Sequence, residues 1–150
     1  MNKNVYMDNG ATSFPKAPGV AEAMSRYINE VGCSVNRGAY ESAFSAENIV
    51  FETREMIASL FNFDKPENVV FTKNITESLN AIIKGLLADG DHVLVSSVEH
   101  NAVMRPLMAL KKRGVSFSRA KCDSEGNLDI EDFKSKIQKN TKAVIMTHGS

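Results

Sequence analysis

The chain has 150 residues, of which 43% are hydrophobic and 24% charged, a balance typical of a globular domain with a substantial core. Its 18 basic and 18 acidic residues cancel, so no net positive field attracts nucleic acid or a lipid surface. Its two cysteines show no metal-like spacing, which indicates free thiols and a reducing compartment. No apolar run is long enough to cross a bilayer, and we expect a cytoplasmic protein without nucleic-acid or membrane partners.

The first part of the chain combines an irregular segment with helices. Residues 1–15 show no regular period, and we interpret them as an N-terminal segment. Apolar residues then recur at helical spacing from Val20 to Val31, and Gly32 is a natural stop. Ser45 can cap a second helix. This part therefore predicts two helices joined by a loop.

From residue 68 onward, strand and helix patterns alternate. The expected elements are a strand at 68–72, a helix at 76–87, a strand at 92–97, a helix at 102–113, a strand at 116–121, a helix that Asp129 can cap and that runs to about residue 138, and a strand at 143–147. Strands that alternate with helices of this length predict a parallel sheet wrapped by helices. The fold class is therefore α/β, with three αβα layers and a mainly parallel sheet. The chain stops directly after a strand, and we interpret residues 16–150 as the front part of a larger domain.

Thr76 is the first candidate for chemistry, because it opens a helix directly after a strand. In parallel sheets, ligands bind beyond the carboxyl ends of the strands, where Thr72–Thr76, Ser97–His100 and Thr147–Ser150 fall. A helix start offers unpaired N–H groups and the positive end of the dipole, and a hydroxyl adds a donor. These features predict a phosphate site. The alternative is a plain helix cap or first-turn residue, which the lack of glycine in the turn favours.

His100 is the second candidate, at the end of the next strand. Its imidazole could stack on an aromatic ring or transfer a proton near neutral pH; the alternative is a histidine satisfied at the strand–helix junction. Glu99 beside it could orient a neighbour or cap the helix, although we favour a local structural role. We expect His92 at the surface, and His148 is a candidate for lining the cleft. The three histidines have no metal-ligand spacing.

Two stretches near the N-terminus could contact a ligand. Arg37 could grip a carboxylate with its planar guanidinium, although a solvated arginine is the commoner outcome. Asp8–Thr12 is rich in small residues, so its backbone could approach a ligand, or it could be an ordinary turn. The sequence contains no P-loop and no dinucleotide-binding glycine pattern.

Several of these segments resemble one family in the same order. Tyr6–Ser13 is similar to an opening Y-L-D-N-A-A-T-T, and Asn36–Gly38 is similar to H-R-G. Phe71–Asn80 resembles F-T-S-G-A-T-E-x-x-N, and Glu99–Val103 resembles E-H-x-A-V. Further similar stretches are the turn 126–129 and the strand 143–148. These motifs are those of cysteine desulfurase-like proteins, the class V group of fold-type I enzymes that use pyridoxal 5′-phosphate (PLP).

The resemblance implies a role for each matched position. Ile75 and Thr76 would bind the cofactor phosphate through backbone and hydroxyl. His100 would stack on the pyridine ring and assist proton transfer, and Ala11 and Arg37 would lie on the substrate side. The fold implied is the large domain of a fold-type I PLP enzyme, incomplete in this chain.

The resemblance also implies an activity. A cysteine desulfurase removes sulfur from L-cysteine, giving alanine and an enzyme persulfide, passes the sulfur to an acceptor protein and is generally a homodimer. The Schiff-base lysine and the sulfur-accepting cysteine come after residue 150 in the family. Cys33 and Cys122 match no catalytic position, so this fragment alone is expected to be inactive.

Three residues depart from the family pattern. Asn74 replaces the glycine of the phosphate turn, Ile75 replaces a small residue, and Asn36 replaces the histidine before Arg-Gly. The alternatives are another class V enzyme (an aminotransferase, a selenocysteine lyase or another C–S lyase) and a non-catalytic α/β domain that binds a phosphorylated ligand. Every enzymatic reading requires the turn before Thr76 and the His100 imidazole to meet at one pocket.

Overall fold

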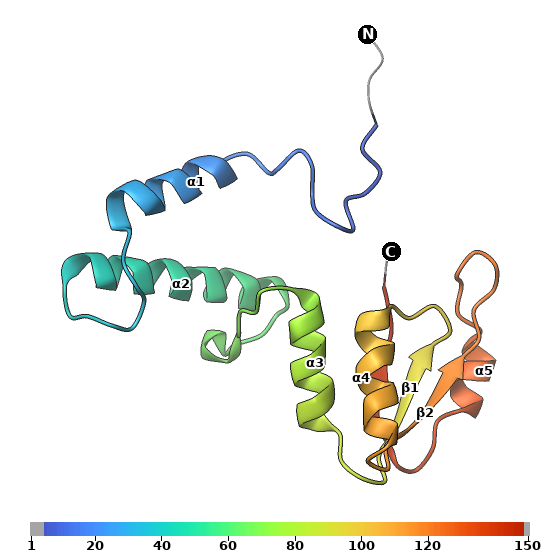
Figure 1. Cartoon of the computed structure of the whole chain (residues 1–150). Helices are drawn as coiled ribbons and strands as arrows, with labels where there is room; N and C mark the ends of the chain where they lie inside the picture. The colour runs from blue at the N-terminus through green and yellow to red at the C-terminus, as the bar shows by residue number, and fades with distance from the viewer. Residues whose placement is uncertain (1–4, 149–150) are drawn as a thin grey trace. The chain divides into compact units, whose positions relative to one another are not determined.

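The computed structural model describes residues 5–148, and the chain divides into two compact units, Met1–Phe71 and Thr72–Ser150. Figure 1 shows the helices of the first unit and the sheet of the second. No helix in the described part of the chain is long and apolar enough to cross a membrane. The proposed division after residue 15 stays a prediction.

The first unit contains two long helical stretches. Helix α1 (Val20–Arg26) continues into the π-helical η1 (Tyr27–Val31), and α2 spans Glu41–Leu60. Gly32 follows η1 with φ 56°, a left-handed conformation that favours glycine at a helix end. The predicted helix stop is confirmed.

The predicted start of α2 at Ser45 is wrong. The helix begins at Glu41, whose negative charge suits the positive end of the helix dipole. Ser45 lies inside the helix, and its hydroxyl donates to the Glu41 carbonyl oxygen at 3.0 Å. A serine can satisfy its hydroxyl on the preceding turn of a helix as well as at a cap, so the residue type alone did not locate the boundary.

The strand predicted at residues 68–72 is also wrong. Pro66–Asn68 form a short 3-10 helix, η2, and the residues that follow pair with no strand among the described residues. Val69 does have extended backbone, with φ −79° and ψ 114°. An apolar run predicts extended backbone, but a strand also requires a partner edge.

The second unit is a βαβαβ arrangement preceded by a helix. Its elements are α3 (Ile75–Leu86), β1 (His92–Ser96), α4 (Asn101–Lys111), β2 (Ser116–Ala120), α5 (Ile130–Ser135) and β3 (Thr141–Ile145). The sheet has the order β2-β1-β3, and both pairings are parallel. The two crossovers move in opposite directions along the sheet, so right-handed connections place α4 and α5 on opposite faces. Figure 1 shows this three-layer arrangement, and the predicted α/β class is confirmed.

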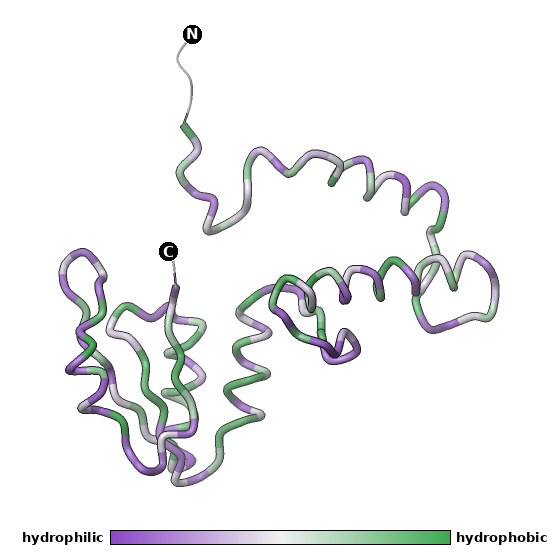
Figure 2. Tube along the Cα trace, turned by 180° about the vertical axis from the view of Figure 1, so that it is seen from behind, coloured by the Kyte–Doolittle hydropathy of each residue, from purple (hydrophilic) through white to green (hydrophobic). Residues whose placement is uncertain are grey.

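The core of this unit lies between β1 and the two helices α3 and α4. It consists of Ile83, Leu87, Val93, Val95, Val103, Met104, Leu107, Leu110 and Val115. All five residues of β1 are buried, because the strand is central and both of its faces are covered. Figure 2 shows hydrophobic residues along the strands of this unit and polar ones in the turn between β2 and α5.

His92 is buried rather than exposed, which corrects the prediction for this residue. It is 1% exposed and begins the central strand. Its Nδ1 lies 2.8 Å from the Thr141 hydroxyl of β3, and its Nε2 lies 3.0 Å from the Ser118 hydroxyl of β2. A neutral imidazole has one donor and one acceptor nitrogen, and hydroxyls can satisfy both. The preceding turn suggested a surface position, but His92 is buried because its strand lies between β2 and β3.

Burial of His92 is expected to make stability depend on pH. Desolvation lowers the pKa of His92 below its usual 6.5, because burial disfavours the charged ring. Above pH 6.5 the ring is neutral in both the folded and the unfolded state, and this contribution to stability is complete. As the pH falls below 6.5, the unfolded state gains a proton that the folded state does not, so stability falls until the folded pKa is reached.

Denaturant unfolding between pH 8 and pH 5 measures this dependence. The unfolding midpoint of the protein should fall more steeply over that interval than the midpoint of His92→Gln, which keeps hydrogen-bonding capacity without a titrating ring. Parallel pH dependences for the two proteins would contradict the assignment.

Candidate functional site

The N-terminus of α3 is organised by its own side chains. Asn74 is the N-cap residue, and its Oδ1 accepts the Glu77 N–H at 2.9 Å. The Glu77 carboxylate in turn accepts the Lys73 N–H at 2.9 Å. The arrangement resembles a capping box, except that Glu77 accepts the N–H of Lys73, the residue before the N-cap, and not that of Asn74 itself. Thr76 is thus a first-turn residue and not the cap, and the helix begins one residue earlier than predicted.

Asn74 does not strain the turn in which the family has glycine. Its φ is −167° and its ψ is 168°, an extended conformation open to any residue. The absence of glycine therefore does not disfavour an anion site through backbone geometry. The difference lies in the Asn74 side chain, which takes the N–H of Glu77 that an anion could otherwise use.

Removing this cap should have a measurable effect. Asn74→Ala is expected to lower stability by about 1 kcal/mol, whereas Asn74→Gly should cost only a few tenths. Thermal unfolding of the two variants beside the parent protein compares them. Equal losses for alanine and glycine would contradict the capping role.

Three donors at the start of α3 remain available. The backbone N–H groups of Ile75 and Thr76 and the Thr76 hydroxyl have no hydrogen-bond partner among residues 5–148. Ile75 and Thr76 are both exposed. Free N–H groups at the positive end of a 12-residue helix form an anion-binding arrangement.

His100 is held at the start of α4. It is the N-cap residue, and its Nδ1 accepts the Ala102 N–H at 3.0 Å. With Nδ1 acting as acceptor, a neutral ring carries its proton on Nε2. The residue is exposed, so Nε2 is the nitrogen available to a ligand. The alternative that His100 only makes a structural hydrogen bond at the strand–helix junction therefore holds for Nδ1. It does not account for Nε2.

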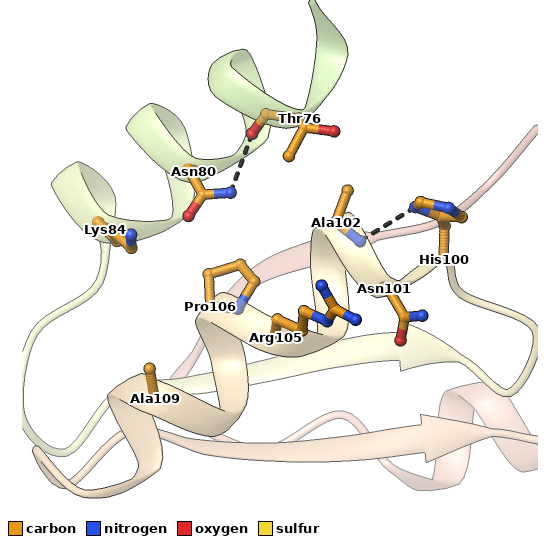
Figure 3. Close-up of a pocket in the computed structure, with 9 residues that line it drawn as sticks. All are labelled: Thr76, Asn80, Lys84, His100, Asn101, Ala102, Arg105, Pro106 and Ala109. Carbon is orange, nitrogen blue, oxygen red and sulfur yellow. Dashed lines mark hydrogen bonds between the residues drawn. The ribbon is translucent and has the colours of Figure 1, made fainter. Parts of the chain in front are cut away.

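The structure brings Thr76 and His100 to the same pocket. The pocket has a volume of about 350 Å³, near the lower end of the range for ligand sites. It is lined by Thr76, Asn80, Lys84, His100, Asn101, Ala102, Arg105, Pro106 and Ala109. Figure 3 shows the Thr76 hydroxyl pointing toward the side of the pocket on which His100 lies.

The charges that line this pocket are positive. Lys84 and Arg105 are its charged residues apart from the titratable His100, and no carboxylate is among the lining residues. The two cations come from α3 and α4, one on each wall. The groove therefore suits an anionic group, in agreement with the free donors at the start of α3.

The chain matches a known family over nearly its whole length. The family model described as "Aminotransferase class-V" matches residues 5–150. The chain belongs to the class-V aminotransferase family.

This class-V chain is similar to proteins from several archaea. It is 36% identical over 150 residues to a probable cysteine desulfurase of Pyrococcus abyssi, and 33% identical over 149 residues to one of Methanothermobacter thermautotrophicus; these alignments cover 97% and 99% of the chain. Among solved structures, the apo cysteine desulfurase of Thermococcus onnurineus superposes with a TM-score of 0.86 at 34% identity over 97% of the chain. The chain spans 37% of the length of each of these three proteins.

The other predicted site residues of this class-V chain are not among the lining residues of the pocket. Ile75 contributes a backbone donor and is not a lining residue, and neither is His148. Ala11 and Arg37 are exposed residues of the first unit. Their substrate-side roles stay predictions.

The stretch around Ala11 is an ordered turn. The Ala11 N–H donates to the Asp8 carbonyl oxygen at 3.1 Å. The Tyr6 hydroxyl lies 3.0 Å from the carbonyl oxygens of both Asp8 and Thr12, and its one hydrogen can be donated to either of them. These bonds support the ordinary-turn reading of Asp8–Thr12 and leave contact with a ligand untested.

Sequence reasoning missed part of the pocket wall. Asn80 and Lys84 follow Thr76 at intervals of four residues, which places all three on one face of α3. Arg105 lies one turn into α4, beyond His100. The four-residue spacing could have indicated these residues, whereas the sequence does not show that α3 and α4 face each other across a groove.

No cluster of metal-ligating side chains occurs in the described residues.

Proposed function

We propose that this chain is the front part of a PLP-dependent cysteine desulfurase, which releases sulfur from L-cysteine and leaves alanine and an enzyme persulfide. A sulfur-acceptor protein would take the persulfide sulfur. Support comes from membership of the class-V family and from relatives named as probable cysteine desulfurases. We propose that the whole protein acts as a cytoplasmic homodimer, and that residues 16–150 are the front part of its PLP-binding large domain.

The residues of the pocket fit the cofactor. The phosphate needs several hydrogen-bond donors, and the start of α3 offers the N–H groups of Ile75 and Thr76 and the Thr76 hydroxyl. The Glu77 carboxylate on the same turn accepts the Lys73 N–H and is not a lining residue of the pocket. The planar ring needs a flat neighbour, which the His100 imidazole provides. This pairing of an anion site and an imidazole in one pocket is the single observation that carries the proposal.

When bound, PLP supplies an electron sink for the carbon from which a proton leaves. The part of this chain is to bind the phosphate, orient the ring and handle a proton. His100 is suited to the last two tasks, because its Nδ1 is occupied by the Ala102 N–H. Nε2 then carries the proton of the neutral ring and is the atom that can donate it on the ligand side.

The sulfur chemistry requires a thiol. We do not assign this role to either cysteine of this chain. Cys33 Sγ lies 2.9 Å from the Ser42 carbonyl oxygen, to which it can donate. Cys122 lies just after β2, where its N–H donates to the Ser97 hydroxyl at 3.0 Å. We propose that the nucleophilic cysteine and the Schiff-base lysine come after residue 150, as the family pattern implies.

Cofactor and product analysis of the full-length protein tests the proposal. Purified protein should show visible absorption from PLP, and with L-cysteine it should form alanine and transferable sulfur in equal amounts. Alanine from selenocysteine alone would indicate a selenocysteine lyase, and amino transfer to a 2-oxo acid would indicate an aminotransferase. Protein that cannot take up PLP would leave the non-catalytic phosphate-binding domain as the better reading.

A further inference from the structure

The turn that carries His100 is tied to both neighbouring strands. On one side, the Ser97 N–H donates to the Ala120 carbonyl oxygen at 2.8 Å, and the Ser97 hydroxyl accepts the Cys122 N–H at 3.0 Å. These two bonds join the turn to β2. The turn is therefore anchored on that side by Ser97.

Glu99 anchors the turn on the other side. Its Oε1 accepts the Thr147 N–H at 2.7 Å, and its Oε2 accepts the Thr147 hydroxyl at 3.0 Å. Thr147 lies just beyond β3, 48 residues along the chain. The ladder between β1 and β3 ends with the pair Val95 and Ile145, so the carboxylate extends the connection past the last paired residues.

The same carboxylate also accepts a hydrogen bond from the last residue of β1. The Ser96 hydroxyl donates to Glu99 Oε1 at 2.5 Å, and Ser96 is 3% exposed. A buried hydroxyl needs a partner, and Glu99 supplies it. One side chain thus accepts three hydrogen bonds from two strand ends, directly before the residue whose imidazole lines the pocket.

We propose that Glu99 is a positioning residue, which sets the direction of the His100 imidazole by fixing the turn between β1 and α4 to the end of β3. The proposal rests on the proposed function, since it assigns His100 to the ligand. Glu99 is not one of the pocket-lining residues and acts through its neighbour. The three hydrogen bonds require acceptor atoms at the positions of the two Glu99 oxygens, but they do not require a negative charge there.

This reasoning separates two substitutions at the same position. In Glu99→Gln, the amide oxygen can accept from Ser96 and from the Thr147 N–H, and the amide NH2 can donate to the Thr147 hydroxyl. Glu99→Ala removes all three bonds. Glu125→Ala is a matched control, because the Glu125 side chain forms no hydrogen bond or ion pair with the described residues.

The experiment uses full-length protein labelled with 15N-histidine. Imidazole nitrogen shifts of His100 report its tautomer and setting without any need for the cofactor. Visible circular dichroism of bound PLP and kcat/KM with L-cysteine are measured on the same variants. We expect Glu99→Ala to move the His100 signals, change the dichroism and lower kcat/KM by about 10–100-fold, because small misplacements of a reacting group are costly. Glu99→Gln and Glu125→Ala should remain close to the parent protein.

Several results would overturn the proposal. A Glu99→Ala protein that unfolds more easily but keeps the His100 signals of the parent would reduce Glu99 to a stabilising residue. Equal damage from glutamine and alanine would show that charge matters and not position. If Glu99→Ala does not fold, Thr147→Val removes the Oε2 bond alone, and unchanged His100 signals in that variant would also overturn the proposal. A parent protein without PLP or desulfurase activity would defeat the proposed function, while the nitrogen shifts would still test Glu99.

Discussion

Replacing His100 by alanine is expected to lower kcat about 10²–10⁴-fold, the usual contribution of a general acid–base group. The variant should also shift the visible band of bound PLP, because the ring loses its flat neighbour. The reason is structural: Nδ1 is engaged by the Ala102 N–H, so Nε2 is the nitrogen that a ligand can meet. Steady-state kinetics and absorption spectra of the loaded protein measure both effects.

His100 also caps α4, and its two roles can be separated. His100→Ala removes both the cap and the imidazole, whereas His100→Asn restores a good N-cap without a proton-transferring ring. We therefore expect asparagine to recover the stability lost with alanine, by about 1 kcal/mol, but not the activity. Recovery of kcat by His100→Asn would remove the imidazole from the mechanism and leave only the cap.

Replacing Thr76 by valine should weaken retention of PLP. Valine keeps the shape of threonine and removes the hydroxyl, and a hydrogen bond to a charged group is worth about 1.5–3 kcal/mol. The expected rise in Kd is roughly 10–150-fold, since each 1.4 kcal/mol is a factor of ten. Equilibrium dialysis or spectroscopic titration of cofactor-free protein measures the change.

Thr76→Ser is the matched control, because it keeps the hydroxyl at the same place on α3. Its Kd should stay close to that of the parent protein. A valine variant that retains PLP as tightly as the serine variant would show that the hydroxyl makes no phosphate contact. In that case the backbone N–H groups of Ile75 and Thr76 would be the remaining candidates for phosphate binding.

The order of elements in the second unit was readable from the sequence. Apolar strands separated by helices predicted a parallel sheet, and the carboxyl-end rule located His100 just beyond β1. For Thr76 the same rule rested on a strand at 68–72 that does not form, although Thr76 does line the same pocket as His100. The Asp129 cap was also readable: the residue precedes α5, and its carboxylate accepts the N–H groups of Glu131 and Asp132. These features depend on local pattern and on general rules of chain direction, which is why sequence sufficed.

Features that depend on a partner far along the chain were not readable. The extended residues after η2 have the composition of a strand, yet they join no sheet among the described residues. His92 looked exposed beside a turn, but its position on the central strand buried it between two hydroxyls. The pocket wall formed by Lys84 and Arg105 required two helices to face each other.

By itself the sequence determined the fold class and the family, because hydrophobic period and short motifs are local properties, and it predicted Thr76 and His100 as the residues that meet a cofactor. Only the tertiary structure decided which atoms of those residues are available. The hydrogen bonds of Glu99 to Thr147, 48 residues along the chain, depend on how the strand ends meet. The role proposed for His100 depends on the turn that Glu99 anchors and on its own cap, which engages Nδ1 and leaves Nε2 without a partner in the cap.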